Sequence, residues 1–130
     1  MIFIDLSGFK AINDLFGHAT GDQVLKVAGT RLMSALRQYD EVGRFGGDEF
    51  LVVCPRVETA LMSLDIAKRL ASSLTQPMKS TSDVIKLRAS VGVAWSSTNI
   101  DADTLIAQAD HAMYESKRNG SSSVALFTPS

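Results

Sequence analysis

The sequence predicts an α+β fold in which helices cover a mostly antiparallel central sheet. Two observations predict it. Apolar residues recur at helical spacing in some segments and in strand-like alternation or short runs in others. The predicted elements follow the order β-α-β-β-α-β-β-α-β, whose adjacent hairpins favour a sheet covered by helices. At 130 residues the chain is one domain, large enough for a single buried core.

The first predicted elements are a buried strand over residues 1–6 and a helix from Thr20 to about Tyr39. A central strand rarely begins a domain, so we expect a fragment that lacks an upstream helical segment. Thr20 and Gln23 match a capping box, in which side chains satisfy free N–H groups of the first turn. The stripe expected to face the core comprises Leu25, Ala28, Leu32 and Leu36.

A β-hairpin is predicted around Gly46-Gly47, because two adjacent glycines can take positive φ and turn the chain tightly. Apolar residues flank the glycines on both sides: Val42, Phe45, Phe50, Leu51, Val52 and Val53. Asp48 and Glu49 follow the glycines at once. The turn therefore holds two carboxylates beside backbone that a ligand can approach closely, which suits a hard cation and a phosphate.

The second half of the chain supplies the remaining elements. A helix is predicted over Glu58–Leu74, with Leu61, Leu64, Ala67, Ala71 and Leu74 directed inward. Residues 80–83 are expected to form a turn before one long strand over Val84–Trp95, in which Ile85, Leu87, Ala89, Val91 and Val93 face the core. A third helix over Asp101–Asn119, with Gly120 as its stop signal, precedes a closing strand over Val124–Phe127.

Composition excludes several classes of protein. The net charge of −1 and pI of about 6.1 give no general affinity for nucleic acid or anionic membrane. No apolar run approaches the ~20 residues that a membrane span needs, and no signal peptide is visible. The single cysteine, Cys54, fits core packing and the cytoplasm. We therefore expect a cytoplasmic domain, which a membrane-anchored protein could also carry.

Three carboxylates form the candidate site. Asp5 ends the first strand, and Asp48 and Glu49 lie on the hairpin. If the two strands are neighbours, Asp5 and Asp48 converge at one edge of the sheet, where paired acids can hold Mg²⁺ through oxygen ligands. Taken alone, each of the three acids is explained as an ordinary turn or helix-cap residue. The hypothesis of a metal site therefore depends on their occurring together.

The chain resembles the GGDEF domains of diguanylate cyclases. Gly46-Gly47-Asp48-Glu49-Phe50 is the signature pentapeptide, and further matches occur in family order across essentially all 130 residues. They are Asp5-Leu-Ser-Gly-Phe9-Lys10, Ile12-Asn13-Asp14, Phe16-Gly17-His18, Gly21-Asp22, Ser90-Val91-Gly92-Val93-Ala94, Ala109-Asp110-His-Ala112-Met-Tyr114 and Lys117. The resemblance implies a ferredoxin-like palm core, shared with adenylyl cyclases and many polymerases.

The resemblance also implies an activity: two GTP condense into cyclic di-GMP and two pyrophosphates across a homodimer, with two Mg²⁺ or Mn²⁺ ions in each half-site. Asp5, Asp48 and Glu49 would be metal ligands and catalytic acids, with the Leu6 carbonyl as a further ligand. Gly8, Phe9, Gly46 and Gly47 would bind substrate through backbone groups. Lys10 and Lys117 would neutralise phosphate charge.

Asn13 and Asp22 would bind guanine. A carboxylate accepts from N1–H and the exocyclic amine of guanine, and adenine offers neither group there. The simpler explanation of Asp22 is a first-turn acid that opposes the helix dipole. An adenylyl cyclase or a polymerase palm is the third hypothesis, against which the Asn13 and Asp22 pair and the near-neutral charge count.

Arg37 and Asp40 match the product-inhibition motif Arg-x-x-Asp at the family's spacing from Gly46, and Arg69 stands where the family often has a supporting arginine. Such a site would bind cyclic di-GMP through the guanidinium fork. The alternative is an ordinary surface ion pair of little energetic consequence.

Two departures weaken the resemblance. Ser7 replaces the second acid of the usual Asp-x-Asp pair, and Ser121 replaces a phosphate-binding arginine. Ser121 and the expected lack of the upstream segment support the alternative of a catalytically weak module that binds GTP or cyclic di-GMP and regulates a neighbouring domain. In the full-length protein we expect fused sensor or phosphodiesterase domains.

Overall fold

The computed structural model describes residues 1–80, 83–119 and 123–129. Five strands form the main sheet in the order β2-β3-β1-β6-β7. Their bounds are β1 Ile2–Ser7, β2 Glu41–Arg44, β3 Glu49–Val53, β6 Arg88–Val93 and β7 Val124–Leu126. Neighbours pair antiparallel except β6 and β7, which are parallel because α4 (Ala102–Arg118) connects them by a crossover. The predicted α+β fold with a mostly antiparallel sheet is confirmed.

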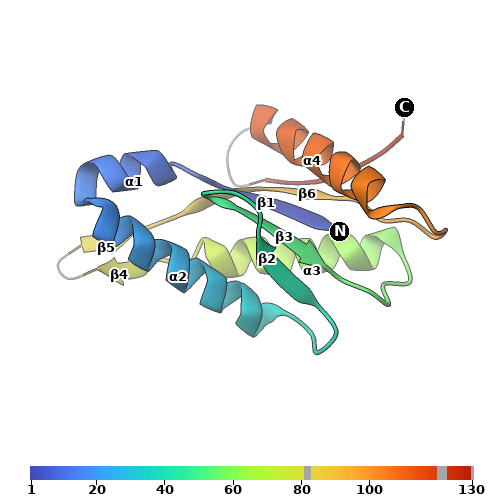
Figure 1. Cartoon of the computed structure of the whole chain (residues 1–130), viewed down its shortest axis with the longest axis horizontal. Helices are drawn as coiled ribbons and strands as arrows, with labels where there is room; N and C mark the ends of the chain where they lie inside the picture. The colour runs from blue at the N-terminus through green and yellow to red at the C-terminus, as the bar shows by residue number, and fades with distance from the viewer. Residues whose placement is uncertain (81–82, 120–122, 130) are drawn as a thin grey trace.

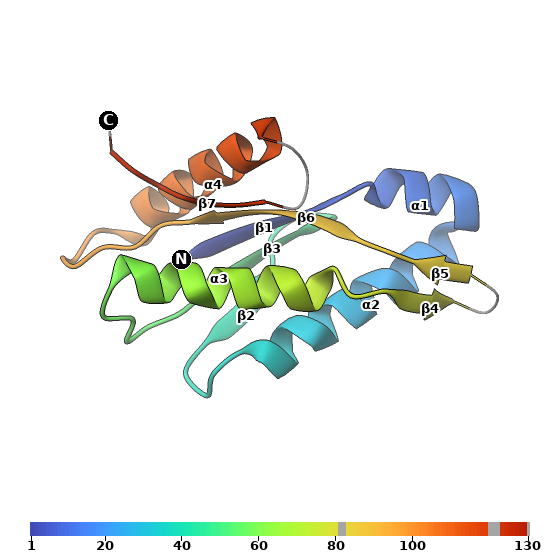
Figure 2. The same cartoon turned by 180° about the vertical axis from the view of Figure 1, so that it is seen from behind.

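Helices cover both faces of this sheet. α4 lies on one face, and α2 (His18–Ala35) and α3 (Ala60–Leu74) lie on the other (Figure 1; Figure 2 shows the same layers from behind). The larger core cluster lies between the sheet and the pair α2 and α3. It includes Ile2, Ile4, Leu6, Leu32, Leu70 and Val91. A smaller cluster beneath α4 comprises Phe3, Ala94, Ala109 and Met113.

Alternation along β1 decides which of its side chains face which helices. Ile2, Ile4 and Leu6 enter the larger cluster, and Phe3 enters the cluster beneath α4. Since successive strand residues point to opposite faces, Asp5 lies on the α4 face. The predicted buried strand over residues 1–6 is thus confirmed, and both of its faces are covered.

One helix was not predicted. α1 spans Phe9–Phe16 and buries Ile12. Its apolar residues recur at Phe9, Ile12 and Phe16, a helical spacing in a segment too short to stand out. Gly17, with φ of 91°, separates α1 from α2.

The predicted boundaries of the second and third elements need correction. α2 begins at His18 and ends at Ala35, without a side-chain cap, so the predicted Thr20 capping box is wrong.

α3 begins at Ala60, where the Thr59 hydroxyl accepts from the Met62 N–H at 3.1 Å. Leu61 is 71% exposed and does not face the core. The prediction holds for Ala67 and Leu74, and the other buried residues of α3 are Ser63, Ile66 and Leu70.

The predicted long strand over residues 84–95 is two strands. β5 (Asp83–Ile85) pairs with β4 (Met78–Ser80) in a small separate sheet, and β6 begins at Arg88. The five residues expected in the core are all buried, from Ile85 to Val93. β6 is buried on its second face as well, because a Cβ on Gly92 would overlap backbone atoms of Ala109 and Met113 in α4. The tip of the predicted turn, residues 81–82, lies outside the described residues.

α4 follows its prediction closely. Asp101 caps it by accepting from the Thr104 N–H at 2.7 Å, and basic residues occupy its last turn. Gly120, the predicted stop signal, lies outside the described residues. Across the part of the chain that the structure describes, no helix combines the length and apolarity required to cross a bilayer.

Candidate active site

The acidic residues gather where β1 and β3 meet. The two strands are neighbours, Asp5 is directly opposite Glu49, and the Leu6 N–H donates to the Asp48 carbonyl at 3.0 Å. Directly opposed residues of an antiparallel pair share a face, so the side chains of Asp5 and Glu49 lie on the same side of the sheet. The predicted convergence of the first strand and the hairpin acids is therefore confirmed.

The hairpin tip is held in a fixed shape. The Arg44 guanidinium donates to the Gly47 carbonyl at 2.7 Å and to the Gly46 carbonyl at 3.2 Å. The Phe45 N–H donates to the Glu49 carbonyl at 2.8 Å, and the Phe45 ring meets Phe3 edge-on at 5.3 Å. A Cβ on Gly46 would lie 2.7 Å from a Glu49 carboxylate oxygen, so a larger residue would displace that acid. Sequence reasoning missed Arg44 as the residue that closes this turn.

Negative charge is concentrated at this end of the sheet. Burial, followed by the charge of Asp5, raises the pKa of the Asp48 carboxyl. Burial and the charges of Asp5 and Asp48 raise the pKa of Glu49 in the same way. Lys117 is the nearest cation: its ammonium pairs with Asp5, which raises the pKa of Lys117. We call Asp5, Asp48, Glu49 and Lys117 the acidic end.

The acidic end can hold Mg²⁺ only together with further oxygen ligands from a bound phosphate or from water. Among the described residues, no three His, Cys, Asp or Glu side chains are close enough together to hold a metal ion by themselves. Mg²⁺ is usually bound through one or two carboxylates together with substrate phosphates and water. Asp5 and Asp48 supply that number of carboxylates, and their mutual repulsion, seen in the raised pKa of Asp48, favours a bound cation. The predicted ligand roles, including that of the Leu6 carbonyl, remain expectations.

Backbone N–H groups begin immediately after β1. Gly8 takes a left-handed conformation, with φ of 79°, and α1 starts at Phe9 without a side-chain cap. The first N–H groups of a helix have no partners within it, and such a turn of successive amides attracts anions. Lys10 lies exposed in the same first turn. This is the arrangement that the predicted phosphate-binding roles of Gly8, Phe9 and Lys10 require.

Asn13 and Asp22 are brought together by α1 packing on α2. A Cβ on Gly21 would overlap the Asn13 side-chain oxygen, so Asn13 rests directly on the backbone beside Asp22. Asp22 itself is exposed, and Asn13 is half-buried. Gly21 therefore has a role that sequence reasoning missed: it lets the two predicted guanine contacts approach one another. A glycine three residues into a helix is the signal that could have revealed it.

Arg37 and Asp40 bind each other. The Arg37 guanidinium donates to both Asp40 carboxylate oxygens at 2.9–3.2 Å, and the Arg37 N–H adds a bond at 2.9 Å. The same guanidinium donates to the Pro55 carbonyl at 2.7 Å. Burial alone would raise the pKa of Asp40, but these bonds hold it below its ordinary value. Arg37 and Arg69 line one pocket of about 350 Å³, so the two predicted product-binding arginines do lie together.

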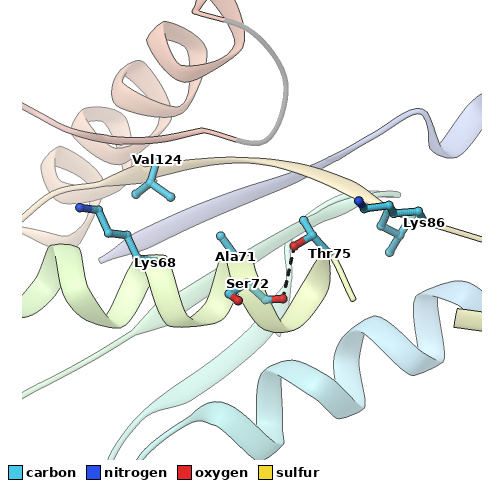
Figure 3. Close-up of a pocket in the computed structure, with 7 residues that line it drawn as sticks. Lys68, Ala71, Ser72, Thr75, Lys86 and Val124 are labelled. Carbon is cyan, nitrogen blue, oxygen red and sulfur yellow. Dashed lines mark hydrogen bonds between the residues drawn. The ribbon is translucent and has the colours of Figure 1, made fainter. Parts of the chain in front are cut away.

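Another pocket lies elsewhere. It measures about 400 Å³ and runs between α3 and the β6–β7 edge, on the face of the sheet away from Asp5 (Figure 3). Lys68 and Lys86 lie at its two ends, and Ser72 and Thr75 lie between them (Figure 3). It contains none of the predicted site residues.

Fold and site together define a palm-like nucleotide-cyclase domain with carboxylates at one end of its sheet. The model of the family described as "Diguanylate cyclase, GGDEF domain" matches residues 1–123. The chain belongs to this family, as the sequence resemblance predicted.

Individual relatives agree with this assignment. The chain is 36% identical to diguanylate cyclase A of Treponema denticola, over 97% of the chain and 34% of that protein. It is 33% identical to the bifunctional diguanylate cyclase/cyclic di-GMP phosphodiesterase MucR of Pseudomonas aeruginosa, over the whole chain and 19% of that protein. The crystal structure of the YfiN (TpbB) GGDEF domain of Pseudomonas aeruginosa superimposes with a TM-score of 0.92 at 34% identity, covering 99% of the chain and 81% of that structure. The chain thus spans about a third or less of the length of these two curated relatives.

Proposed function

We propose that this domain is the catalytic domain of a diguanylate cyclase, which joins two GTP into cyclic di-GMP and releases two pyrophosphates. The observation that carries the proposal is the convergence of Asp5, Asp48 and Glu49 beside the uncapped start of α1. Membership of the family supports the reaction, and the site supplies the groups that such a reaction needs: acids for a cation, free amides for phosphate and an Asn–Asp pair for guanine.

In the proposed reaction each domain holds one GTP and two domains meet face to face. The 3′-oxygen of one GTP bonds to the α-phosphorus of the other, pyrophosphate leaves with the electron pair, and the hydroxyl proton passes to a base. Two Mg²⁺ or Mn²⁺ ions, when bound, lower the pKa of the attacking hydroxyl and offset charge on the leaving group. Because the displacement is in-line, the protein contributes mainly positioning and charge neutralisation.

In this chain, individual site residues would each contribute to positioning or to charge neutralisation. Asp5 and Asp48 hold the metal, with the Leu6 carbonyl as a further ligand, and Glu49 serves as an additional ligand or as the base. The N–H groups at Gly8 and Phe9 bind phosphate, and Lys10 and Lys117 neutralise its charge. For Lys117 this means exchanging its ion pair with Asp5 for one with phosphate.

Guanine selectivity would come from Asn13 and Asp22. A carboxylate that accepts two hydrogen bonds from guanine meets no donor at the same positions of adenine. Losing such a bond costs about 1–3 kcal/mol, or roughly 5- to 150-fold in binding. The exposure of Asp22 in the free domain leaves it accessible to the base.

Product inhibition at Arg37, Asp40 and Arg69 is the finer part of the proposal. The shared pocket of Arg37 and Arg69 supports it. The bonds between Arg37 and Asp40 oppose it, since both groups already have partners. Cyclic di-GMP would have to bind the free edge of Arg37 or displace Asp40.

A catalytically weak binding module is the second candidate. Ser7, which stands where the family usually has a second acid, lies half-buried at the end of β1 and adds no charge to the acidic end. Ser121 lies outside the described residues. In this case the domain would bind GTP or cyclic di-GMP and regulate a fused domain.

Incubation with GTP and Mg²⁺ at high protein concentration, followed by chromatography of the products, separates the two candidates. We expect cyclic di-GMP and pyrophosphate from GTP and no cyclic product from ATP. The control is Asp103→Asn, which changes an exposed acid in the first turn of α4. Tight nucleotide binding by calorimetry without turnover, in a forcibly dimerised protein, would establish the binding module instead.

A further inference from the structure

Ser90 lies in the middle of β6 with 0% of its surface exposed. Its hydroxyl has no hydrogen-bond partner in the protein, the one such buried side-chain nitrogen or oxygen in residues 1–80, 83–119 and 123–129. Buried polar groups are nearly always paired, because an unpaired one loses its hydration without compensation. A buried hydroxyl kept in this state needs an explanation.

Other buried serines in this fold are satisfied. The Ser63 hydroxyl donates to the Ala60 carbonyl at 2.6 Å, and the Ser116 hydroxyl donates to the Ser123 carbonyl at 2.6 Å. Each bonds locally, within its helix or to the strand beside it. The unpaired hydroxyl of Ser90 is therefore a property of its position and not of buried serines in general.

That position is beside the acidic end. Ser90 is directly opposite Asp5, as Asp5 is directly opposite Glu49, so the three side chains form one row across β6, β1 and β3. Directly opposed residues have Cβ atoms about 4.5–5.5 Å apart, within reach of a hydrogen bond from a hydroxyl to a carboxylate. The acceptor directly opposite Ser90 on this face is the Asp5 carboxylate, which in the free domain is paired with Lys117.

α4 covers the row formed by Ser90, Asp5 and Glu49 on this face of the sheet. It approaches β6 so closely at Gly92 that a Cβ there would overlap its backbone, and its last turn carries Lys117 to Asp5. Ser90 is enclosed between these two contacts. A hydroxyl enclosed in this way can turn to Asp5 but has no route to bulk solvent.

We propose that Ser90 is a positioning residue for the metal site: when a divalent cation replaces Lys117 as the partner of Asp5, the Ser90 hydroxyl donates to the Asp5 carboxylate and fixes its orientation. The proposal rests on the metal-dependent function proposed above. Partners that orient a metal ligand typically change metal affinity 10- to 100-fold when removed. Ser90 would then be unpaired in the free domain because its partner is engaged elsewhere, and paired in the loaded one.

The test measures binding of Mn²⁺ in the presence of a non-hydrolysable GTP analogue, by electron paramagnetic resonance of the protein-bound ion, together with the melting temperature. Ser90→Ala removes the hydroxyl, and Ser90→Cys keeps the volume while replacing it with a weak donor. Ser63→Ala is the matched control, since it removes a buried, bonded serine far from Asp5. We expect Mn²⁺ affinity to fall 10- to 100-fold in both Ser90 variants, with a melting temperature that is unchanged or higher, because an unpaired buried hydroxyl stabilises nothing. Ser63→Ala should instead lower the melting temperature and leave Mn²⁺ affinity unchanged.

The outcomes separate the two proposals. Mn²⁺ affinity within twofold of the parent in Ser90→Ala would overturn the role of Ser90 and leave the proposed function intact. A loss of affinity accompanied by a clearly lower melting temperature would assign Ser90 to packing, which also overturns it. Absence of Mn²⁺ binding by the parent protein in the presence of the GTP analogue would remove the metal site itself and both proposals with it.

Discussion

At the acidic end of the sheet, Lys117 pairs with Asp5 and Arg44 adds only a weaker attraction at Asp48, whereas in the loop after α2 the carboxylate of Asp40 accepts hydrogen bonds from the guanidinium of Arg37. The pKa values of Asp48 and Glu49 are raised, and that of Asp40 is lowered. The first region holds charge that the fold does not neutralise, and the second holds charge that it does. The acidic end therefore keeps negative charge that can attract a cation, whereas the Arg37–Asp40 pair already stabilises the free domain.

The largest test of this comparison is Asp48→Asn. We expect cyclic di-GMP formation to fall by at least about 100-fold, since even the partners of metal ligands change activity 10- to 100-fold. Stability should be unchanged or higher at neutral pH, because the raised pKa of Asp48 means that folding disfavours its charged form. Product chromatography and urea unfolding measure the two effects. A clearly less stable variant would show that Asp48 supports the fold and would break the comparison.

Asp40→Ala tests the opposite region. Hydrogen bonds between charged groups contribute about 1.5–3 kcal/mol, and the Asp40 side chain is 0% exposed, so we expect a loss of this order in the free energy of unfolding at pH 7. Because the folded pKa of Asp40 is lowered, its contribution is present above the ordinary value of 3.8 and is lost as the pH falls below it. Urea unfolding from pH 7 to pH 2 should show this loss in the parent and not in the variant.

Glu58→Ala is the matched control for that series, since Glu58 is an exposed acid in the loop before α3. Its unfolding free energy should follow the parent at every pH. A parent-like pH profile in Asp40→Ala would mean that the Arg37–Asp40 pair is an ordinary surface ion pair.

The smallest expected effect is that of Lys117→Gln on the free domain. The Lys117 side chain is 43% exposed but that of Asp5 only 11%, and glutamine can still donate a hydrogen bond to the buried carboxylate, so the free energy of unfolding should fall by about 1 kcal/mol. Removing this cation should raise the pKa of Asp48 and Glu49 further, because Lys117 lowers both. Carbon-13 titration of the carboxyl groups measures the shift, with Lys26→Gln on α2 as control. Unmoved titration curves would show that Lys117 does not neutralise the acidic end.

Most of the fold followed from the sequence pattern alone. The inward-facing residues from Ile85 to Val93, the hairpin at Gly46-Gly47 and the helix that begins after Asp101 are local signals, and each was predicted correctly. The errors concern features that depend on tertiary packing: which face of a helix is buried, and whether a short helix forms. Leu61 fits a helical stripe as well as Ile66 does, but the orientation of α3 on the sheet exposes it. α1 has only two turns and is stabilised by packing on α2, so its short pattern was overlooked.

The residues of the candidate site could be predicted from the sequence, but the contacts between them could not. Motif resemblance named Asp5, Asp48 and Lys117, yet neither the ion pair between Lys117 and Asp5 nor the bonds from Arg44 to the hairpin tip can be read from spacing. Ser90 is the extreme case, because a serine in an alternating strand is expected to face water. Only the approach of α4 at Gly92, which depends on the whole crossover, shows that it is buried.

The central place of β1 in the sheet has a consequence for biosynthesis. Its two neighbours are β3 and β6, so the segment that carries Asp5 is translated well before both of its hydrogen-bonding partners exist. At roughly 5–20 residues per second, a ribosome needs several seconds to go from Asp5 to Ser90. During that interval the row formed by Ser90, Asp5 and Glu49 is incomplete, and β1 cannot yet be paired on both sides.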